Sequence, residues 1–440
     1  MLNIGLSIVQ NRVASSLSTA FADFGANPSI IAADADQNAL FLSDASTGNV
    51  LTSVSLSEFG APTNGSGFIG FDKSGNAIEY SDGELPRTWD ASNNQWIWMT
   101  DPAVTRISPL DPNSWPLKMG TTVLTNLNTD DLNDYTFSRD QHFASVRSQD
   151  DYPVVAGNRY TLSALVHDSS DSSAEMVLDS RDDTGVSVFR CQLLFDAEGN
   201  LTTSNISFVT GDGVDWGDQS IVTVERGGGW WEVHMSGTAT KTGTSTNYGM
   251  YVGGDVGSGI LRIKALQLTQ TDEFHGLVGG DQTVGNVDRE ALEWTLGSRA
   301  RAAVQAATNL TVGNAWTQPS ASDDERHLFQ IDNASTFSVR TSSSGVAEAQ
   351  AAAGTSSTGT TPAAGGHRIA AAMGSSDLSV SLDGASTVST AGSASSLSSI
   401  TTIAVGAAAD GSLGVRGGIN KIAIAAVDTS NADLEAWSGL

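Results

Sequence analysis

The loop at residues 211–218 holds residue types that suit sugar binding. Its sequence, Gly-Asp-Gly-Val-Asp-Trp-Gly-Asp, places one tryptophan among three aspartates: Trp216, Asp212, Asp215 and Asp218. An exposed indole can lie against the apolar face of a pyranose ring, while carboxylates accept hydrogen bonds from its hydroxyls or chelate calcium. The alternative is a solvated turn whose tryptophan packs on the edge of a sandwich. The two interpretations make opposite predictions about the exposure of Trp216.

Paired carboxylates are the chemistry that would make the chain a glycoside hydrolase. Such a pair stands about 5 Å apart in retaining enzymes and about 6.5–9.5 Å apart in inverting ones, so on one strand the two residues would be spaced by two. The E-x-D-x-E run that would set such carboxylates along one strand does not occur, and the C-terminal glutamates, Glu325, Glu348 and Glu435, lie outside clear strand patterns. The chain also lacks a G-x-S-x-G elbow, an H-E-x-x-H pair and a P-loop. We therefore predict no catalytic residues and no enzymatic activity, with pairing of carboxylates from separate strands as the alternative.

The overall composition disfavours several classes of binding partner. The 440 residues include 49 acidic and 22 basic side chains, a formal net charge of −27 that repels nucleic-acid phosphate and anionic lipid. No apolar run approaches the ~20 residues of a membrane-spanning helix, so we expect neither a nucleic-acid partner nor membrane insertion. Cys191 is the only cysteine, which excludes an internal disulfide and a cysteine zinc cluster. No cofactor is required, although the carboxylates could hold calcium.

The elements that must position these groups are predicted to be strands. The chain has 46 glycines and only 16% charged residues, which suits short strands and tight turns better than long helices. One strand pattern places four apolar side chains on a single face: Phe189, Cys191, Leu193 and Phe195. We expect this face to be buried and Cys191 to be unreactive. Residues 378–382 alternate strictly and end in the hairpin signal Asp383-Gly384.

The predicted fold class is all-β, with two antiparallel β-sandwich (jelly-roll) domains. Residues 1–30 form a helical attachment and oligomerisation segment, because an apolar stripe recurs every three or four residues: Leu6, Val9, Val13, Leu17 and Phe21. The remaining predicted boundaries are an irregular β-rich connector over 31–130, a sandwich over 131–272, a linker over 273–300 and a second sandwich over 301–440.

Three stretches resemble modular structural proteins of tailed phages and gene transfer agents. The connector carries ELPRTWD and TNLN, similar to the segment that introduces the carbohydrate-binding-module-like sandwich of those proteins: Pro86, Arg87, Asp90, Thr125, Asn126 and Leu127. The middle stretch is similar to that sandwich in the order RYTLSALV, CQLLFDAEGNL, GGGWWEVHMSGTA and SGILRIKALQL. The C-terminal stretch resembles a concanavalin A-like lectin domain in HRIAAAMGSSDLSVSLDG, ITTIAVGAAADGS and GGINKIAIAAVDTSNADLEAW.

The resemblance implies a virion fibre, spike or decoration protein that binds host surface polysaccharide. Its other partners would be virion proteins and further copies of itself, with a trimer favoured. The N-terminus has neither a basic leader nor a continuous apolar stretch, so we expect no signal peptide and an extracellular location only after release of the particle. The alternatives are a polysaccharide depolymerase on the same particle and a purely structural decoration protein.

Overall fold

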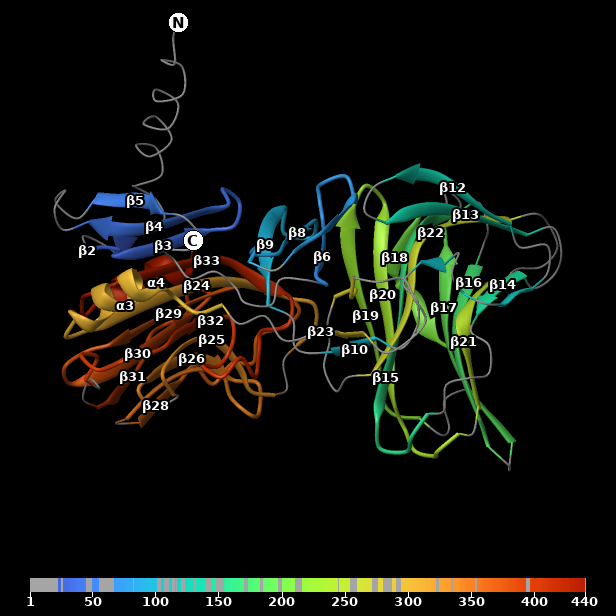
Figure 1. Ribbon diagram of the computed structural model, residues 1–440. Helices are drawn as coiled ribbons and strands as arrows, with labels where there is room; N and C mark the ends of the chain where they lie inside the picture. The colour runs from blue at the N-terminus through green and yellow to red at the C-terminus, as the bar shows by residue number, and fades with distance from the viewer. Residues whose placement is uncertain are drawn as a thin grey trace, which may run out of the picture.

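The chain is almost entirely β-structure in the computed structural model (Figure 1). The structure describes residues 23–24, 27–44, 50–54, 67–81, 83–100, 104–106, 111–112, 115, 117–119, 123–129, 132–139, 144–147, 154–169, 173–182, 185–196, 200–209, 216–243, 245–253, 259–270, 276–279, 287–289, 294–321, 324–333, 335–352, 354–392 and 396–439. Across these ranges the only helices are α3 (Ser298–Gln305) and α4 (Asn431–Gly439), which confirms the predicted all-β class. Neither helix is long and apolar enough to cross a membrane. The predicted N-terminal helix and its apolar stripe lie outside the described residues.

Two sheets form the middle sandwich, the mainly green lobe of Figure 1. The first sheet has the strand order β12-β13-β22-β15-β20-β19, with β10 beside β22 and β23 beside β10, and the second has the order β11-β14-β21-β16-β17-β18. The strands are β10 (Val104–Arg106), β11 (Leu117–Met119), β12 (Val123–Thr129), β13 (Asn133–Arg139), β14 (Ala144–Arg147), β15 (Arg159–Ser169), β16 (Ser173–Asp182), β17 (Gly185–Phe195), β18 (Leu201–Phe208), β19 (Trp216–Gly227), β20 (Trp230–Ala239), β21 (Ser245–Gly253), β22 (Gly259–Gln270) and β23 (Val287–Arg289). The apolar face predicted for β17 points into the core, where Cys191 is fully buried.

Two further sheets form the C-terminal sandwich. The larger has the order β31-β30-β29-β24-β33-β3-β4-β5, with β9 beside β33 and β8 beside β9, and the smaller has the order β28-β27-β26-β25-β32. The strands are β3 (Ile31–Asp34), β4 (Ala39–Asp44), β5 (Val50–Val54), β8 (Arg87–Asp90), β9 (Gln95–Met99), β24 (Leu310–Gln318), β25 (Arg326–Ile331), β26 (Phe337–Thr341), β27 (Ala347–Ala351), β28 (Gly354–Ser357), β29 (Gly365–Met373), β30 (Asp377–Leu382), β31 (Val388–Ala391), β32 (Ile403–Val405) and β33 (Gly418–Ala425). Leu434 and Trp437 of α4 pack on alanines of the outer face of the larger sheet.

The strands do not pair within the boundaries expected from the sequence. β33 lies between β24 and β3, and its register joins Ile424 to Ile31 and Ile422 to Ala33. Both isoleucines and the alanines that alternate with them are fully buried, so β33 is a central strand that needs a partner on each side. That partner comes from the N-terminal part of the chain. Residues 31–54 and 87–99 therefore belong to the C-terminal sandwich rather than to a separate connector.

The middle sandwich is inserted between these distant strands. Its sheets include β10 to β14, which lie at 104–147 in the expected connector and beyond its border. The expected linker at 273–300 also contributes, because β23 pairs with β10 and the buried Leu277 packs against Leu165 and Ala265. Figure 1 shows the result as a blue and orange-red lobe beside a green one. Whether each lobe folds independently stays a prediction.

Two short hairpins complete the described chain: β1 (Asp23–Phe24) with β2 (Asn27–Pro28), and β6 (Ile69–Phe71) with β7 (Ala77–Glu79). The β6–β7 hairpin contacts both lobes. The Phe71 amide donates to Thr88 Oγ1 of β8, and Lys264 Nζ of β22 donates to the Gly75 carbonyl, each at 3.0 Å. Gly228 has a φ of +58°, and a Cβ there would lie 2.1 Å from the Ser74 carbonyl oxygen, so this turn requires glycine.

Candidate functional site

The tryptophan of the 211–218 loop is a core residue. Trp216 begins β19 with 4% of its surface exposed. Its indole stacks on Phe189 with 5.4 Å between ring centroids and meets Tyr160 edge-on at 6.4 Å. An indole packed in this way offers no face to a sugar ring. The structure therefore corrects the predicted sugar-binding role of Trp216 in favour of packing.

Of the three aspartates around Trp216, the structure describes only Asp218. Asp218 has a φ of +47°, its carbonyl accepts Arg159 Nη1 at 2.8 Å, and its carboxylate accepts Thr238 Oγ1 at 3.4 Å. These contacts shape the start of β19. Asp212 and Asp215 lie outside the described residues, so their part in a sugar or calcium site stays a prediction. In the part of the chain that is described, no three His, Cys, Asp or Glu side chains gather as a metal site.

A line of buried polar side chains crosses three strands of the middle sandwich. Arg226 of β19 contacts Glu232 of β20 through Nε and Nη2, both at 2.6 Å. Glu232 Oε1 lies 2.9 Å from His234 Nε2, and His234 Nδ1 lies 2.7 Å from Ser163 Oγ of β15. Burial alone would raise the pKa of Glu232, but Arg226 and His234 outweigh it and lower the pKa to about 2.

The order serine, histidine, glutamate resembles a nucleophile–base–acid relay, but its surroundings give it a structural role. Ser163 and Glu232 are fully buried, and His234 is 1% exposed. A substrate therefore has no access to the Ser163 hydroxyl, and the Glu232 carboxylate is held by Arg226. The line ties β15, β19 and β20 together.

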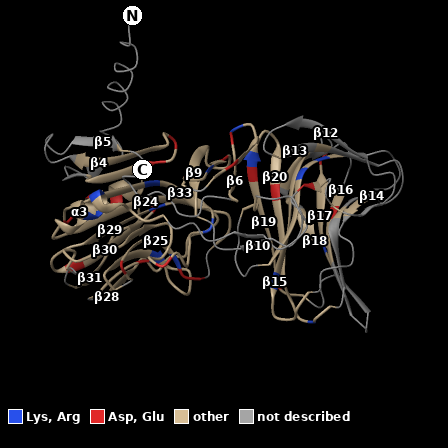
Figure 2. Cartoon of the chain, in the orientation of Figure 1, with Lys and Arg blue, Asp and Glu red and all other residues tan. Residues whose placement is uncertain are grey.

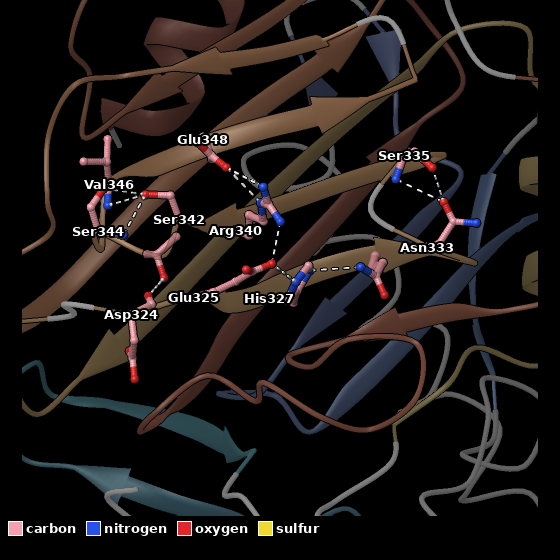
Figure 3. A network of polar contacts seen from close by, with 12 residues as sticks. Asp324, Glu325, His327, Asn333, Ser335, Arg340, Ser342, Ser344, Val346 and Glu348 are labelled. Carbon is pink, nitrogen blue, oxygen red and sulfur yellow. Dashed lines mark hydrogen bonds and ion pairs between the residues drawn. The ribbon is translucent and has the colours of Figure 1, made fainter. Parts of the chain in front are cut away.

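A second polar network lies on the smaller sheet of the C-terminal sandwich (Figure 3). Arg340 of β26 contacts Glu325 through Nη1 and Glu348 of β27 through Nη2, at 2.5 and 2.8 Å. Arg340 and Glu348 are register partners, so the cross-strand pair follows from strand pairing. Figure 2 places both signs of charge close together near β25. The shared guanidinium fills the space between the two carboxylates, where a glycosidic bond would need to lie.

His327 completes this network as a neutral ring. Gln330 Oε1 accepts the Ala409 amide at 2.6 Å, so the Gln330 amino group faces His327 Nδ1 at 3.2 Å. The proton of the ring is therefore on Nε2, which donates to Glu325 at 3.0 Å. Burial, with help from Arg340, lowers the pKa of His327 below its ordinary 6.5 against the opposing effect of Glu325.

Separate segments do bring one pair of aspartates together. Carboxylate oxygens of Asp377, at the start of β30, and Asp428, after β33, lie 2.7 and 2.5 Å from the point that a Cβ on Gly374 would occupy. The two oxygens are thus within the ~5 Å spacing of a retaining carboxylate pair. Burial and the neighbouring Asp377 charge raise the pKa of Asp428.

A hollow of about 390 Å³ opens on the surface of the C-terminal sandwich. We call it the polar hollow, and its main side chains are Asn93, Gln95, Trp316, His367, Arg368 and Asp383. Ser438, near the end of α4, also lines it. The residues come from the turn before β9 and its first residue, from β24 and β29, from the Asp383-Gly384 turn and from the end of α4. That turn has positive φ at both positions, 50° and 72°, as its sequence predicts.

His367 and Asp383 form an ion pair in the wall of the polar hollow. His367 Nδ1 lies 2.8 Å from Asp383 Oδ2, and Nε2 lies 2.9 Å from the Ala363 carbonyl oxygen. Both partners are acceptors, so the ring must carry two protons to donate to each. Burial alone would lower the pKa of His367, but these two acceptors outweigh it and raise the pKa. The imidazolium also packs against Trp316, with 5.3 Å between ring centroids.

A second pocket adjoins the polar hollow between the two lobes. This interlobe pocket encloses about 310 Å³ and shares Asn93 with the hollow. Its lining includes Ile97 and Met99 of β9 and Val224 and Arg226 of β19, so both sandwiches contribute. An elongated ligand in the polar hollow could therefore extend across a more apolar surface towards the middle sandwich.

Sequence reasoning missed the polar hollow. His367 and Arg368 fall in the stretch HRIAAAM, for which the sequence indicates only a likeness to a lectin-like domain. The available signal was two adjacent basic residues in a chain with 22 bases against 49 acids. The approach of Asn93 to Gly366 could not be foreseen, because it joins segments that are distant in the sequence.

No protein-family model matches the sequence, and no curated protein matches it. Solved structures similar to it include the CBM40 of a Ruminococcus gnavus IT-sialidase bound to α2,3-sialyllactose, at 13% identity and a TM-score of 0.27 over 32% of this chain and 89% of that one. A leech intramolecular trans-sialidase matches at 14% identity and a TM-score of 0.27, over 34% of this chain and 26% of that one. A Trypanosoma rangeli sialidase matches at 8% identity and a TM-score of 0.27, over 91% and 67%.

These comparisons contradict the prediction that the chain is not an enzyme, because sialidases and trans-sialidases are enzymes. At these identities and TM-scores the likeness assigns neither a ligand nor a reaction to this chain. Catalysis therefore belongs among the functions to be tested, beside carbohydrate binding.

Proposed function

We propose that this chain binds carbohydrate in the polar hollow of its C-terminal sandwich. The observation that carries the proposal is a surface hollow lined by planar polar side chains, including the amides of Asn93 and Gln95 and the charged His367. The amino groups of Asn93 and Gln95 donate to Asp90 Oδ2 and Thr317 Oγ1, and their amide oxygens can accept hydrogen bonds from the hydroxyls of a sugar ring. A few convergent polar groups of this kind fix a ligand's orientation in a pocket. The adjoining interlobe pocket would hold a following sugar of a longer chain.

The finer proposal is that the protein is a virion fibre, spike or decoration protein that attaches a phage-like particle to host surface polysaccharide. The sequence resemblance described above supports it. The N-terminal 30 residues would join the particle and assemble a homo-oligomer, with a trimer as first choice. Several copies per particle would raise the avidity of a weak site by ~10²–10⁴. Calcium bound near Asp212 and Asp215 is part of this proposal.

Carbohydrate binding is tested with the full-length protein on a panel of neutral and acidic glycans, including sialyllactose, the ligand in one Ruminococcus gnavus structure. We expect binding that Asn93→Ala and Gln95→Ala weaken, because each removes an amide from the polar hollow. Thr202→Ala, an exposed change on β18, serves as the matched control. Binding that both hollow variants leave unchanged would place the sugar site elsewhere, and no binding to any glycan would refute the proposal.

Particle attachment and assembly need their own measurements. Light scattering on the full-length protein should give an oligomer, and removal of residues 1–30 should give a smaller species. A full-length monomer at micromolar concentration that the truncation leaves unchanged would contradict assembly through this segment. Labelling of particles with an antibody to the protein should place it on the virion in micrographs, and unlabelled particles would contradict that location.

Glycoside hydrolysis is a second candidate function, favoured by the Asp377–Asp428 pair. In that reaction Asp428, with its raised pKa, would protonate the leaving oxygen, and Asp377 would act as the second carboxylate. Release of reducing ends from purified host polysaccharide measures it directly, and Asp428→Asn should abolish the release. Release that persists in this variant would exclude the pair as the catalytic site, and no release from the unmodified protein would exclude the candidate.

A further inference from the structure

Arg368 lies in the wall of the polar hollow and has no ion-pair partner among the residues that the structure describes. Its backbone amide donates to Asp383 Oδ1 at 2.8 Å, but within the described residues its guanidinium takes part in no hydrogen bond or ion pair. The side chain is half-buried, and burial lowers the pKa of Arg368 with no carboxylate opposing that effect. A guanidinium that has lost part of its hydration without gaining a partner favours the approach of an anion.

The Asp383 carboxylate in the hollow is occupied by groups other than the Arg368 guanidinium. Asp383 uses Oδ2 for the His367 imidazolium and Oδ1 for the Arg368 backbone amide. The His367–Asp383 pair is therefore neutral as a unit. The charge of Arg368 is then the net charge that these three residues present to a ligand.

Several other arginines in the described part of the chain are paired with carboxylates, and Arg159 and Arg301 donate to neutral oxygens. Arg226 is paired with Glu232, Arg340 with Glu325 and Glu348, and Arg416 with Asp324. In a chain with more than twice as many acids as bases, carboxylates are abundant. Arg368 differs from all of these, because within the described residues its guanidinium has neither a carboxylate nor a neutral partner.

We propose that the polar hollow binds a carboxylate-bearing saccharide, such as a uronic acid, with Arg368 holding the sugar carboxylate. This inference rests on the proposed carbohydrate function and names the class of sugar. A guanidinium matches a carboxylate with two parallel hydrogen bonds, and the amides of Asn93 and Gln95 lie in the same hollow for the ring hydroxyls. The net charge of −27 repels polyanions elsewhere on the protein, so an acidic sugar has reason to bind only where the local charge is positive.

The test compares oligogalacturonate with its methyl ester, which keeps the sugar and removes the charge. Isothermal titration of the full-length protein should show the acid binding at least about tenfold more tightly than the ester, as charge-assisted hydrogen bonds imply. Arg368→Gln should remove that preference and leave ester binding unchanged. Arg368→Lys keeps the positive charge but loses the paired N–H donors of the guanidinium, so it should retain part of the preference for the acid. Inorganic phosphate, which a guanidinium also binds, should compete far more weakly than the acidic sugar, because it lacks the ring that Asn93 and Gln95 would contact.

Arg301→Gln is the matched control, since it also removes one positive charge from the C-terminal sandwich but outside the polar hollow, where Arg301 donates to the Thr401 carbonyl. It should keep the preference for the acid. Three results would overturn the inference while carbohydrate binding stands. These are equal binding of acid and ester, an equal effect of Arg301→Gln and Arg368→Gln, and displacement of the acid by phosphate at an equal concentration. Failure of both probes and of every glycan in the panel would overturn the inference and the proposed function together.

Discussion

Two histidines of the C-terminal sandwich are held in opposite protonation states by the groups around them. His327 faces a fixed amide donor at Nδ1, so a second proton would set two donors against each other. His367 faces an acceptor at each nitrogen, so it needs the second proton. The difference arises entirely from neighbours and not from the residue type.

We expect the two imidazoles to titrate on opposite sides of 6.5, with His327 below and His367 above. The contribution of His327 to stability is then present at neutral pH and lost as the pH falls below 6.5. That of His367 is present at low pH and lost as the pH rises through its raised pKa. NMR titration of the full-length protein, assigned with His327→Gln and His367→Gln, measures both midpoints. Midpoints on the same side of 6.5 would contradict the two networks.

Cys191 lies on the buried face of β17, and burial raises the pKa of its thiol to about 12. A thiol of this kind has almost no thiolate at neutral pH, and the thiolate is the form that reacts. We expect a thiol reagent to leave the native protein unlabelled and to label it after denaturation. Rapid labelling of the folded protein would show that the core opens around β17.

At the scale of elements, buried polar side chains hold neighbouring strands of the middle sandwich together. The contacts that run from Arg226 to Ser163 join β19, β20 and β15 through charged and hydrogen-bonded side chains that are buried away from water. A buried ion pair stabilises a fold little more than two well-packed apolar side chains would. Removal of one partner is costly, because it leaves the other charge buried without a counter-charge. A single substitution among these buried polar residues should therefore destabilise the sheet.

We expect Glu232→Gln to lower the free energy of unfolding by about 3–5 kcal/mol, because Arg226 would stay buried without its counter-charge. Glu175→Gln is the control, since Glu175 meets Arg190 at 3.4 Å on a partly exposed surface and should cost less than about 1 kcal/mol. Chemical denaturation of both variants checks the difference. The low pKa of Glu232 also predicts that the wild-type advantage fades as the pH falls from 4.5 towards 2. Equal costs for the two variants would contradict the prediction.

At the scale of the whole molecule, one sandwich is inserted into another. The chain contributes β3 to β5, β8 and β9 to the larger C-terminal sheet before it builds the middle sandwich. It then returns to complete that sheet with β24, β29 to β31 and β33. The Ile30 amide donates to the Ile424 carbonyl at 2.7 Å, which shows how closely the two parts of the chain meet. Strands so far apart in sequence pair only after a long loop has closed.

We expect residues 294–440 alone to aggregate, because without β3 and β9 the apolar strand β33 presents an open edge. Residues 27–100 joined to 294–440 by a flexible linker should unfold cooperatively, since this variant restores those strands. Denaturation followed by circular dichroism, with size-exclusion chromatography, compares the two fragments. A stable, monomeric fragment 294–440 would show that the N-terminal strands are dispensable.

The sequence alone determined the features that depend on nearest neighbours. Alternation with period two predicts the β17 face with Cys191, and Asp-Gly predicts the turn at 383–384, because strand faces and turn geometry are set within a few residues. The tertiary structure decided what long-range contacts control. Trp216 lies in a loop whose composition suits a sugar platform, yet Phe189 and Tyr160 from other strands bury it. The polar hollow likewise exists only because the β8–β9 turn meets β29, some 270 residues later in the sequence, and strand pairing at that separation leaves no local signal.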